Sequence, residues 1–120
     1  MTIKTKNVFA QPEGSDGERY LITRLYAARP KSMKECRIDK WIRDLAPSKE
    51  LLYDYLHRHI STRQYTRRFT QEIDSNPKAQ ETLDILRTKV KQGITVTLLC
   101  KCAEGVFCHR NIVKDMLERS

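Results

Sequence analysis

Long apolar stretches and signal sequences are both missing from this chain of 120 residues. No apolar run approaches the roughly 20 residues of a membrane-spanning helix, and residues 1–6 lack the apolar core of a signal peptide. Only four cysteines are present, unevenly spaced and without a Cys-x-x-Cys redox pair. We therefore expect a cytoplasmic protein without membrane contact, whose cysteines are thiols or metal ligands rather than a disulfide framework.

Acidic side chains are absent from two stretches of the chain. The sequence contains 23 Lys and Arg against 15 Asp and Glu, a formal net charge of +8. No acidic residue occurs between Glu18 and Glu35, or between Asp54 and Glu72. This balance favours polyanionic partners such as RNA or DNA. A positively charged, solvated surface accounts for the same composition.

The pattern of apolar and turn-forming residues predicts a single α/β domain over residues 1–120. We expect strands at 3–9, 20–26 and 94–102, because these runs are apolar and β-branched. Helices are expected between Ser32 and Pro47, around 51–56, from 61, from 76 to 93, and from 108 to the C-terminus. The first rests on a capping box at its start and on the helical spacing of four apolar residues: Ile38, Trp41, Ile42 and Leu45.

Strand, helices, strand and helix in this order predict a small, mostly parallel sheet flanked by helices. Ligands of such sheets bind beyond the carboxyl ends of the strands. Arg24 lies near one such end, and Cys100 and Cys102 lie at another. These side chains share one crevice if the two strands are parallel neighbours.

Three of the four cysteines and one histidine fall within ten residues, at the end of the strand over 94–102 and the start of the last helix. The free N–H groups at a helix start stabilise a thiolate and attract anions. Cys108 occupies this position, and Arg110 adds a cation. His109 shares the inward stripe of the helix with four apolar residues: Ile112, Val113, Met116 and Leu117.

Three interpretations of this cluster remain open. The side chains form an anion-binding or thiol-dependent site, they are ordinary core and helix-start residues, or they bind a metal. A metal site would use four soft ligands of the kind that zinc prefers: Cys100, Cys102, Cys108 and His109. Neither Cys100 nor Cys102 is followed by an arginine at the six-residue offset of the tyrosine phosphatases.

Four blocks of the sequence resemble the YeaO-like family of small proteins, a domain without an assigned function. The blocks span most of the chain: 15–26 (SDGERYLITRLY), 41–48 (WIRDLAPS), 96–100 (VTLLC) and 108–110 (CHR). The resemblance implies a compact α/β domain and no established activity.

By position, Arg24 matches the strand-end arginine of that family. Its central block is matched by Trp41, Asp44, Pro47 and Ser48, and its cysteine-bearing C-terminal variant by Cys100, Cys108, His109 and Arg110. Thr23 stands where many relatives have an aspartate. Ala27-Ala28-Arg29 replaces a Pro-Arg-Gly turn, so Arg29 is the candidate for the turn arginine. Trp41 is also explained as a core residue, and Asp44 or Ser48 as a cap of the turn at Pro47.

Our leading hypothesis is a crevice for a small molecule that carries a phosphate or carboxylate. Cys108 would be the reactive thiol and His109 its base, and the anion would be bound by Arg24, Arg29, Arg110 and Cys100. The alternative is a basic module that binds RNA or DNA through Arg58, Arg63, Arg67 and Arg68. We expect no cofactor.

Overall fold

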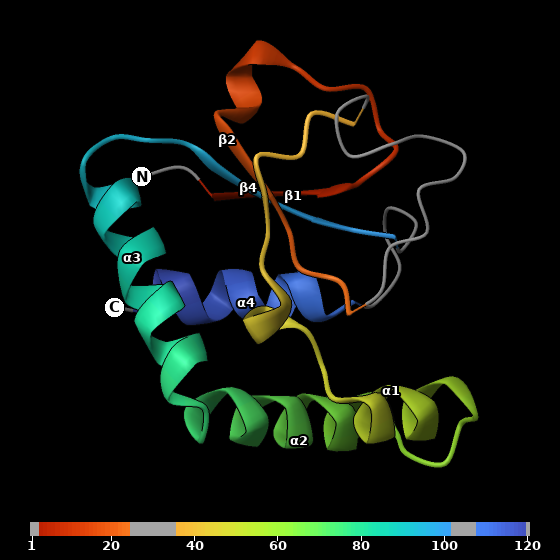
Figure 1. The fold of residues 1–120 in the computed structure, drawn as a ribbon. Coiled ribbons are helices and arrows are strands. Elements are labelled where there is room, and N and C mark those ends of the chain that lie inside the picture. Colours follow the sequence, from red (N-terminus) through yellow and green to blue (C-terminus); the bar gives the residue numbers. More distant parts are fainter. Residues whose placement is uncertain (1–2, 25–35, 102–107, 120) are drawn as a thin grey trace.

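A computed structural model describes residues 3–24, 36–101 and 108–119. Its centre is a four-stranded sheet in the order β1-β4-β2-β3 (Figure 1). The strands are β1 (Ile3–Asn7), β2 (Glu18–Leu21), β3 (Lys40–Trp41) and β4 (Val96–Cys100). All three neighbouring pairs are parallel, which confirms the predicted class of fold.

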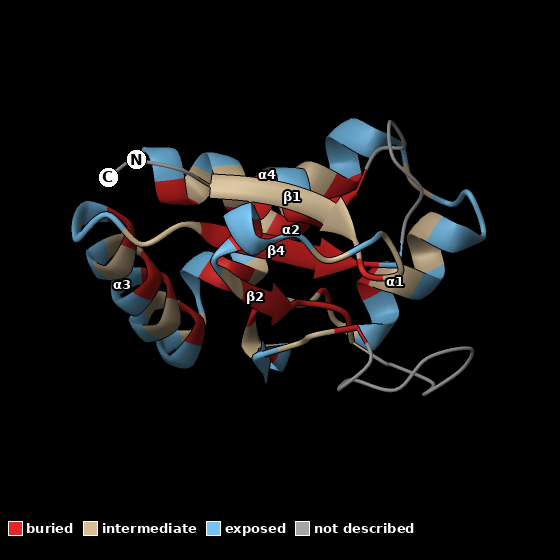
Figure 2. Ribbon diagram, turned by 90° about the horizontal axis from the view of Figure 1, so that it is seen from above, coloured by how far each residue is buried: buried red, intermediate tan, exposed pale blue. Residues whose placement is uncertain are grey.

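β4 lies between β1 and β2 and is buried along its whole length (Figure 2). Leu98 is opposite Thr5 of β1 on one side and Tyr20 of β2 on the other. A strand flanked on both sides and covered on both faces is continuously apolar, as the run from Val96 to Cys100 nearly is. β2 and β4 are parallel neighbours, so their carboxyl ends meet at one edge of the sheet.

The helices are α1 (Lys49–Leu56), α2 (Thr62–Asp74), α3 (Pro77–Lys91) and α4 (His109–Glu118). Ser61 and Gln64 form a capping box at the start of α2, and Asn76 caps α3 ahead of Pro77. Ser48 caps α1 by accepting a hydrogen bond from the Leu51 amide, so it caps a helix start, whereas a cap of the turn at Pro47 was predicted. Within the described residues, no helix is long and apolar enough to cross a membrane.

The four helices lie on one side of the sheet (Figure 1). α4 packs directly against β1 and β4, and α2 and α3 pack against α4. The large core lies between these elements and includes Phe69, Leu86, Leu98 and Val113. Because α2 contacts α4, its buried aromatic residues come close to the start of α4.

The opposite face of the sheet carries a smaller core and a buried ion network. Asp16 and Arg19 are fully buried and paired at 2.6 Å between Oδ2 and Nη1. Lys4 and Lys6 donate to the same carboxylate at 2.6 and 3.1 Å. Burial opposes ionisation of Asp16, but the hydrogen bonds from Lys4, Lys6, the Glu13 amide and Arg19 outweigh it and hold the pKa of Asp16 well below its usual range.

The helix predicted between Ser32 and Pro47 is wrong where the structure describes it. Residues 25–35 lie outside the described residues. The remainder forms the edge strand β3, Lys40–Trp41, and the 3-10 helix η2, Arg43–Leu45.

The apolar residues at helical spacing in this segment do not share one face. Ile38 and Trp41 pack on the smaller core, whereas Ile42 and Leu45 belong to the large one. Arg37 adopts a left-handed backbone with φ 53°, which ends any helix at that point. Its carbonyl accepts a hydrogen bond from Nε of the buried Arg19 at 3.1 Å. Pairing with β2 and with Arg19 therefore overrides the local helical pattern.

Candidate functional site

The ends of two neighbouring strands and the start of α4 come together at the carboxyl edge of the sheet. Cys100 is the last residue of β4, and Cys108 is the N-cap of α4. β2 ends at Leu21 and is followed by Ile22, Thr23 and Arg24. Residues from around positions 23, 100 and 108 therefore lie together at this edge of the sheet.

A cavity of about 330 Å³, which we call the thiol cavity, opens at this edge. It contains the predicted residues Arg24, Cys100, Cys108 and His109, which the structure therefore brings together. Its full lining is Thr23, Arg24, Pro47, Leu52, Tyr55, Leu56, Tyr65, Cys100, Lys101, Cys108 and His109. This volume is at the lower end of the range for small-molecule sites.

His109 is held between the end of β2 and the Cys108 thiol. Its Nε2 lies 2.6 Å from the carbonyl oxygen of Ile22. Because a carbonyl only accepts, Nε2 carries the proton in the neutral ring. Nδ1 is then a lone pair, and it lies 3.6 Å from Sγ of Cys108. The edge-to-face ring of Phe69, 5.7 Å away between centroids, packs against the imidazole.

The two described thiols of the cavity are in contact. Sγ of Cys100 and Sγ of Cys108 are 2.9 Å apart, and their residues are 0% and 3% exposed. Cys108 therefore has a base on one side and a second thiol on the other. This arrangement is the one expected of a nucleophile whose proton can be removed.

The charge of the cavity is positive. Arg24 and Lys101 belong to its wall, and none of the described residues that line it is acidic. Pro47, Leu52 and Leu56 add apolar side chains to the lining. A ligand with an anionic end and a small apolar body has the complementary character.

The remaining predicted site residues are not placed in this cavity. Arg110 is buried in the first turn of α4 but is not among the described residues that line the thiol cavity. Arg29 and Cys102 lie outside the described residues. Of the metal ligands considered, Cys102 is therefore undescribed, and no group of three His, Cys, Asp or Glu that could hold a metal ion occurs in the described part of the chain.

Sequence reasoning missed the walls that α1 and α2 contribute. Leu52, Tyr55 and Leu56 have the spacing of the inner face of the short helix expected around 51–56, yet Leu56 is 67% exposed and lies at the cavity. Tyr65 of α2 is buried, and its ring packs against Tyr55 at 4.5 Å between centroids. Apolar spacing predicts that such residues face inward, but it does not distinguish a core from a cavity wall.

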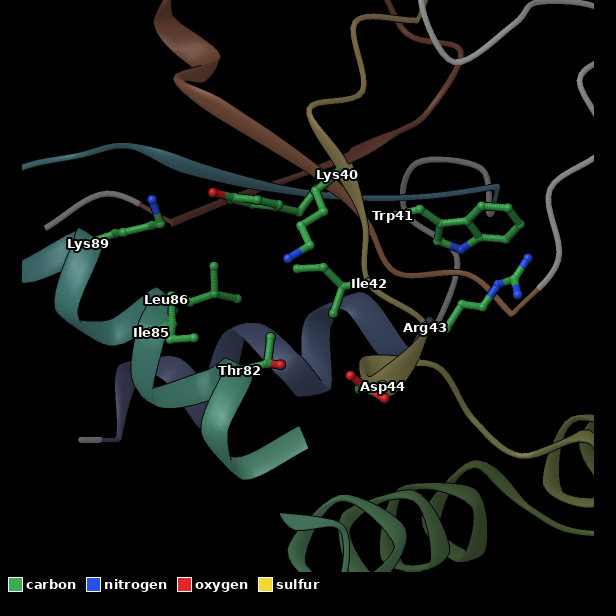
Figure 3. Close-up of a pocket in the computed structure, with 10 residues that line it drawn as sticks. Lys40, Trp41, Ile42, Arg43, Asp44, Thr82, Ile85, Leu86 and Lys89 are labelled. Atoms are coloured by element: carbon green, nitrogen blue, oxygen red, sulfur yellow. The ribbon is translucent and has the colours of Figure 1, made fainter. Parts of the chain in front are cut away.

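A second cavity, of about 550 Å³, lies between the edge strand β3, η2 and α3 (Figure 3). Figure 3 shows Ile85 and Leu86 of α3 facing Lys40 and Ile42 across it. The Arg43 guanidinium lies 4.1 Å from the centroid of the Trp41 ring. The described lining of this second cavity contains no cysteine or histidine. The second cavity therefore offers no nucleophile and base comparable with those of the thiol cavity.

The fold and the site together define a small parallel α/β domain with a thiol and an imidazole at the carboxyl edge of its sheet. The chain belongs to the family described as the Active DUF488-N3 subclade, which matches residues 3–120. The YeaO-like resemblance is consistent with this result, because YeaO is itself a DUF488 member. Neither the curated proteins nor the solved structures include a match to the chain.

Proposed function

We propose that the protein binds a small molecule bearing a phosphate or carboxylate in the thiol cavity, and that Cys108 acts there as a nucleophile. The observation that carries this proposal is the pairing of Cys108 with His109. The Ile22 carbonyl fixes the protonated nitrogen, which leaves the Nδ1 lone pair 3.6 Å from the Cys108 sulfur. The description of the family as an active subclade agrees with a reactive site.

The proposed chemistry begins with transfer of the Cys108 proton to Nδ1 of His109. The resulting imidazolium keeps its hydrogen bond to the Ile22 carbonyl, and it stands beside the thiolate as a counter-charge. The thiolate attacks an electrophilic atom next to the anionic group of the ligand. The imidazolium then returns the proton to the leaving group.

The proposed binding of the anion rests on the charges around the cavity. Arg24 and Lys101 supply cationic side chains in its wall. Arg110, buried directly after His109 at the start of α4, adds a third positive charge near the thiol. A bound carboxylate or phosphate would contact Arg24 and Lys101 without a competing acidic group in the described lining.

The proposal is tested by the pH dependence of iodoacetamide labelling of the reduced, native protein, with the modified cysteines located by mass spectrometry. Cys108 should react fastest, and below the free-thiol pKa of about 8.5. Inorganic phosphate should slow its labelling. His109→Gln retains a donor for the Ile22 carbonyl but cannot accept the thiol proton, so it should remove the reactivity below about pH 8. Cys36, buried in the smaller core, is the internal reference.

Matched charge variants identify the side chains that bind the anion. Arg24→Gln and Lys101→Gln should each abolish the protection by phosphate, whereas Lys40→Gln, at the second cavity, should leave it unchanged. Uniformly slow labelling without protection by phosphate would contradict the proposal and leave the cysteines as structural residues. Stoichiometric bound zinc in the purified protein would also contradict the proposal and would favour the metal-site interpretation instead.

A second candidate function, binding of single-stranded RNA or DNA, is favoured by an exposed group of rings beside α2. Tyr53 is 55% exposed and stacks on His57 at 4.0 Å between centroids. His59 lies 5.9 Å from both rings. Exposed rings near arginines are the stacking platform that such proteins use.

The arginines of this candidate are not equivalent. Arg63 and Arg67 are exposed on α2 and line one shallow depression with Thr62 and Thr66. Arg68 instead donates to Asp54 at 2.7 Å. Arg63 and Arg67 are therefore the better candidates for phosphate contacts.

This candidate is tested by fluorescence anisotropy with a labelled single-stranded oligonucleotide. Affinity should fall steeply with salt. It should also fall in the Arg63→Glu, Arg67→Glu double variant and in Tyr53→Ala, but not in Lys91→Glu at the far end of α3. Binding that is insensitive to salt, or that Lys91→Glu weakens as much as the double variant, would overturn it.

A further inference from the structure

The contact between the two buried thiols has a consequence beyond nucleophilic chemistry. Cys100 and Cys108 are eight positions apart, and their sulfur atoms are 2.9 Å apart. A disulfide has an S–S length of about 2.05 Å, so only a small approach is needed to join them. Cys100 ends β4 and Cys108 caps α4, and both residues are buried, so the packing of this strand and helix maintains the proximity of the two thiols.

The two thiols are chemically different. Cys108 lies beside the Nδ1 lone pair of His109, at 3.6 Å, and is therefore the thiol that loses its proton. Cys100, at the end of β4, contacts Cys108 from the side of the sheet. In a reaction with a peroxide, the Cys108 thiolate would attack the oxidant first, and Cys100 would then attack the oxidised Cys108.

We propose that Cys108 and Cys100 form a reversible oxidation site for hydrogen peroxide or a small organic hydroperoxide. The Cys108 thiolate attacks one peroxide oxygen and the O–O bond breaks. This yields a sulfenic acid and hydroxide (or alkoxide), which takes the proton from His109. The Cys100 thiol then attacks Sγ of Cys108, the S–O bond breaks, and the departing hydroxide takes the Cys100 proton as water. The two thiols lose two electrons, and the peroxide gains them.

This inference rests on the proposed function, because it assigns Cys108 as the reactive thiol of the same cavity. Both sulfur atoms are buried from bulk solvent, but both residues line the thiol cavity, which admits a molecule as small as peroxide. A disulfide would consume the nucleophile. Oxidation would therefore switch off the chemistry of Cys108, and a dithiol reductant would restore it.

The positions of the trypsin cleavage sites allow the cysteines that form the disulfide to be identified. Trypsin cleaves after Lys91, Lys101 and Arg110, and so separates Cys100, in peptide 92–101, from Cys102 and Cys108, both in peptide 102–110. The native protein is treated with a few equivalents of hydrogen peroxide, blocked with N-ethylmaleimide and digested without reduction. We expect peptides 92–101 and 102–110 to be joined through Cys108, and dithiothreitol to separate them.

Single variants assign the roles. Cys102→Ser and Cys36→Ser should form the same cross-link as the wild-type protein. Cys108→Ser should form none. Cys100→Ser should instead accumulate Cys108 sulfenic acid, which dimedone traps, and then the sulfinic acid. A cross-link through Cys102 in the wild-type protein, or thiols unchanged after this treatment, would overturn the inference.

The failure of this inference is distinguishable from failure of the proposed function. Selective labelling of Cys108 in the reduced protein, with protection by phosphate but without a peroxide-induced disulfide, leaves the proposed function standing and removes the oxidation site. A Cys100–Cys108 disulfide in a protein that phosphate does not protect keeps the oxidation site and removes the anion site.

Discussion

At the scale of single residues, Asp16 is a charged side chain in a buried environment. Its carboxylate is fully buried beneath the sheet yet remains ionised, because Lys4, Lys6 and Arg19 donate to it. Its carbonyl also accepts from the hydroxyl of Thr97 in β4, at 2.7 Å. A buried charge that loses its partners costs several kcal/mol. Through the hydrogen bond from Thr97, Asp16 joins the segment before β2 to the central strand.

The low pKa of Asp16 makes stability depend on pH. A carboxyl group whose pKa is lower in the folded than in the unfolded protein stabilises the fold above its unfolded pKa, near 3.8. That contribution is lost as the pH falls toward the folded value. We expect the free energy of unfolding, measured with urea, to decrease between about pH 5 and pH 2.

Asp16→Asn should lower the free energy of unfolding by about 3–5 kcal/mol at pH 7, because the buried Arg19 loses its counter-charge. Its stability should also fall less steeply with acid than that of the wild-type protein. Glu13→Gln is the control, since that carboxylate is exposed although it pairs with Lys6 at 2.6 Å. An equal acid dependence of the wild-type protein and Asp16→Asn would contradict this role.

Among the elements, β2 depends on the turn that precedes it. Gly17 has φ 64°, and a Cβ at this position would lie 2.2 Å from the carbonyl oxygen of Thr95. That same oxygen accepts a hydrogen bond from the Glu18 amide at 2.9 Å. The close approach of the turn to Thr95 places Glu18 opposite Val96 and so sets the register of β2 on β4.

Gly17→Ala should therefore destabilise the protein by about 1–3 kcal/mol, from a strained backbone and a steric clash. Gly14→Ala is a matched control in the same segment, because a Cβ there meets nothing within 4 Å. Its unfolding midpoint should be unchanged or slightly higher. Equal stability of the two variants in urea would show that the turn tolerates a side chain.

At the scale of the whole molecule, one sheet separates two cores. Leu98 and Leu99 are consecutive in β4 and both fully buried, but Leu98 belongs to the core under the helices and Leu99 to the smaller core. Successive side chains of a strand point to opposite faces. Because the central strand contributes buried side chains to both cores, we expect the two cores to unfold together.

Leu98→Ala and Leu99→Ala should each lower the free energy of unfolding by about 2–5 kcal/mol. The single tryptophan, Trp41, reports on the smaller core, and far-UV circular dichroism reports on the helices. Both signals should give the same urea midpoint in each variant. Ile85→Ala, at a side chain that is 51% exposed, should change it little. Separate midpoints for the two signals would indicate that the faces unfold independently.

The sequence by itself determined the helix starts and most of the elements. Capping at Ser61 and Asn76 involves residues within three positions of each other, so local chemistry decides it. The three predicted strands were also found, but with different bounds: β2 begins earlier and ends earlier, at Glu18–Leu21, and β4 is shorter, at Val96–Cys100. His109 was correctly expected to face inward, because helical periodicity fixes its side of α4.

Only the tertiary structure decided the strand β3 and the geometry of the candidate site. The segment around Trp41 has helical spacing, but its pairing with β2 and the buried Arg19 override that preference. The proton position on His109 depends on the carbonyl of Ile22, 87 residues away. The walls from α1 and α2 likewise depend on how those helices pack. Such relations arise from packing between distant segments, which neither composition nor periodicity encodes.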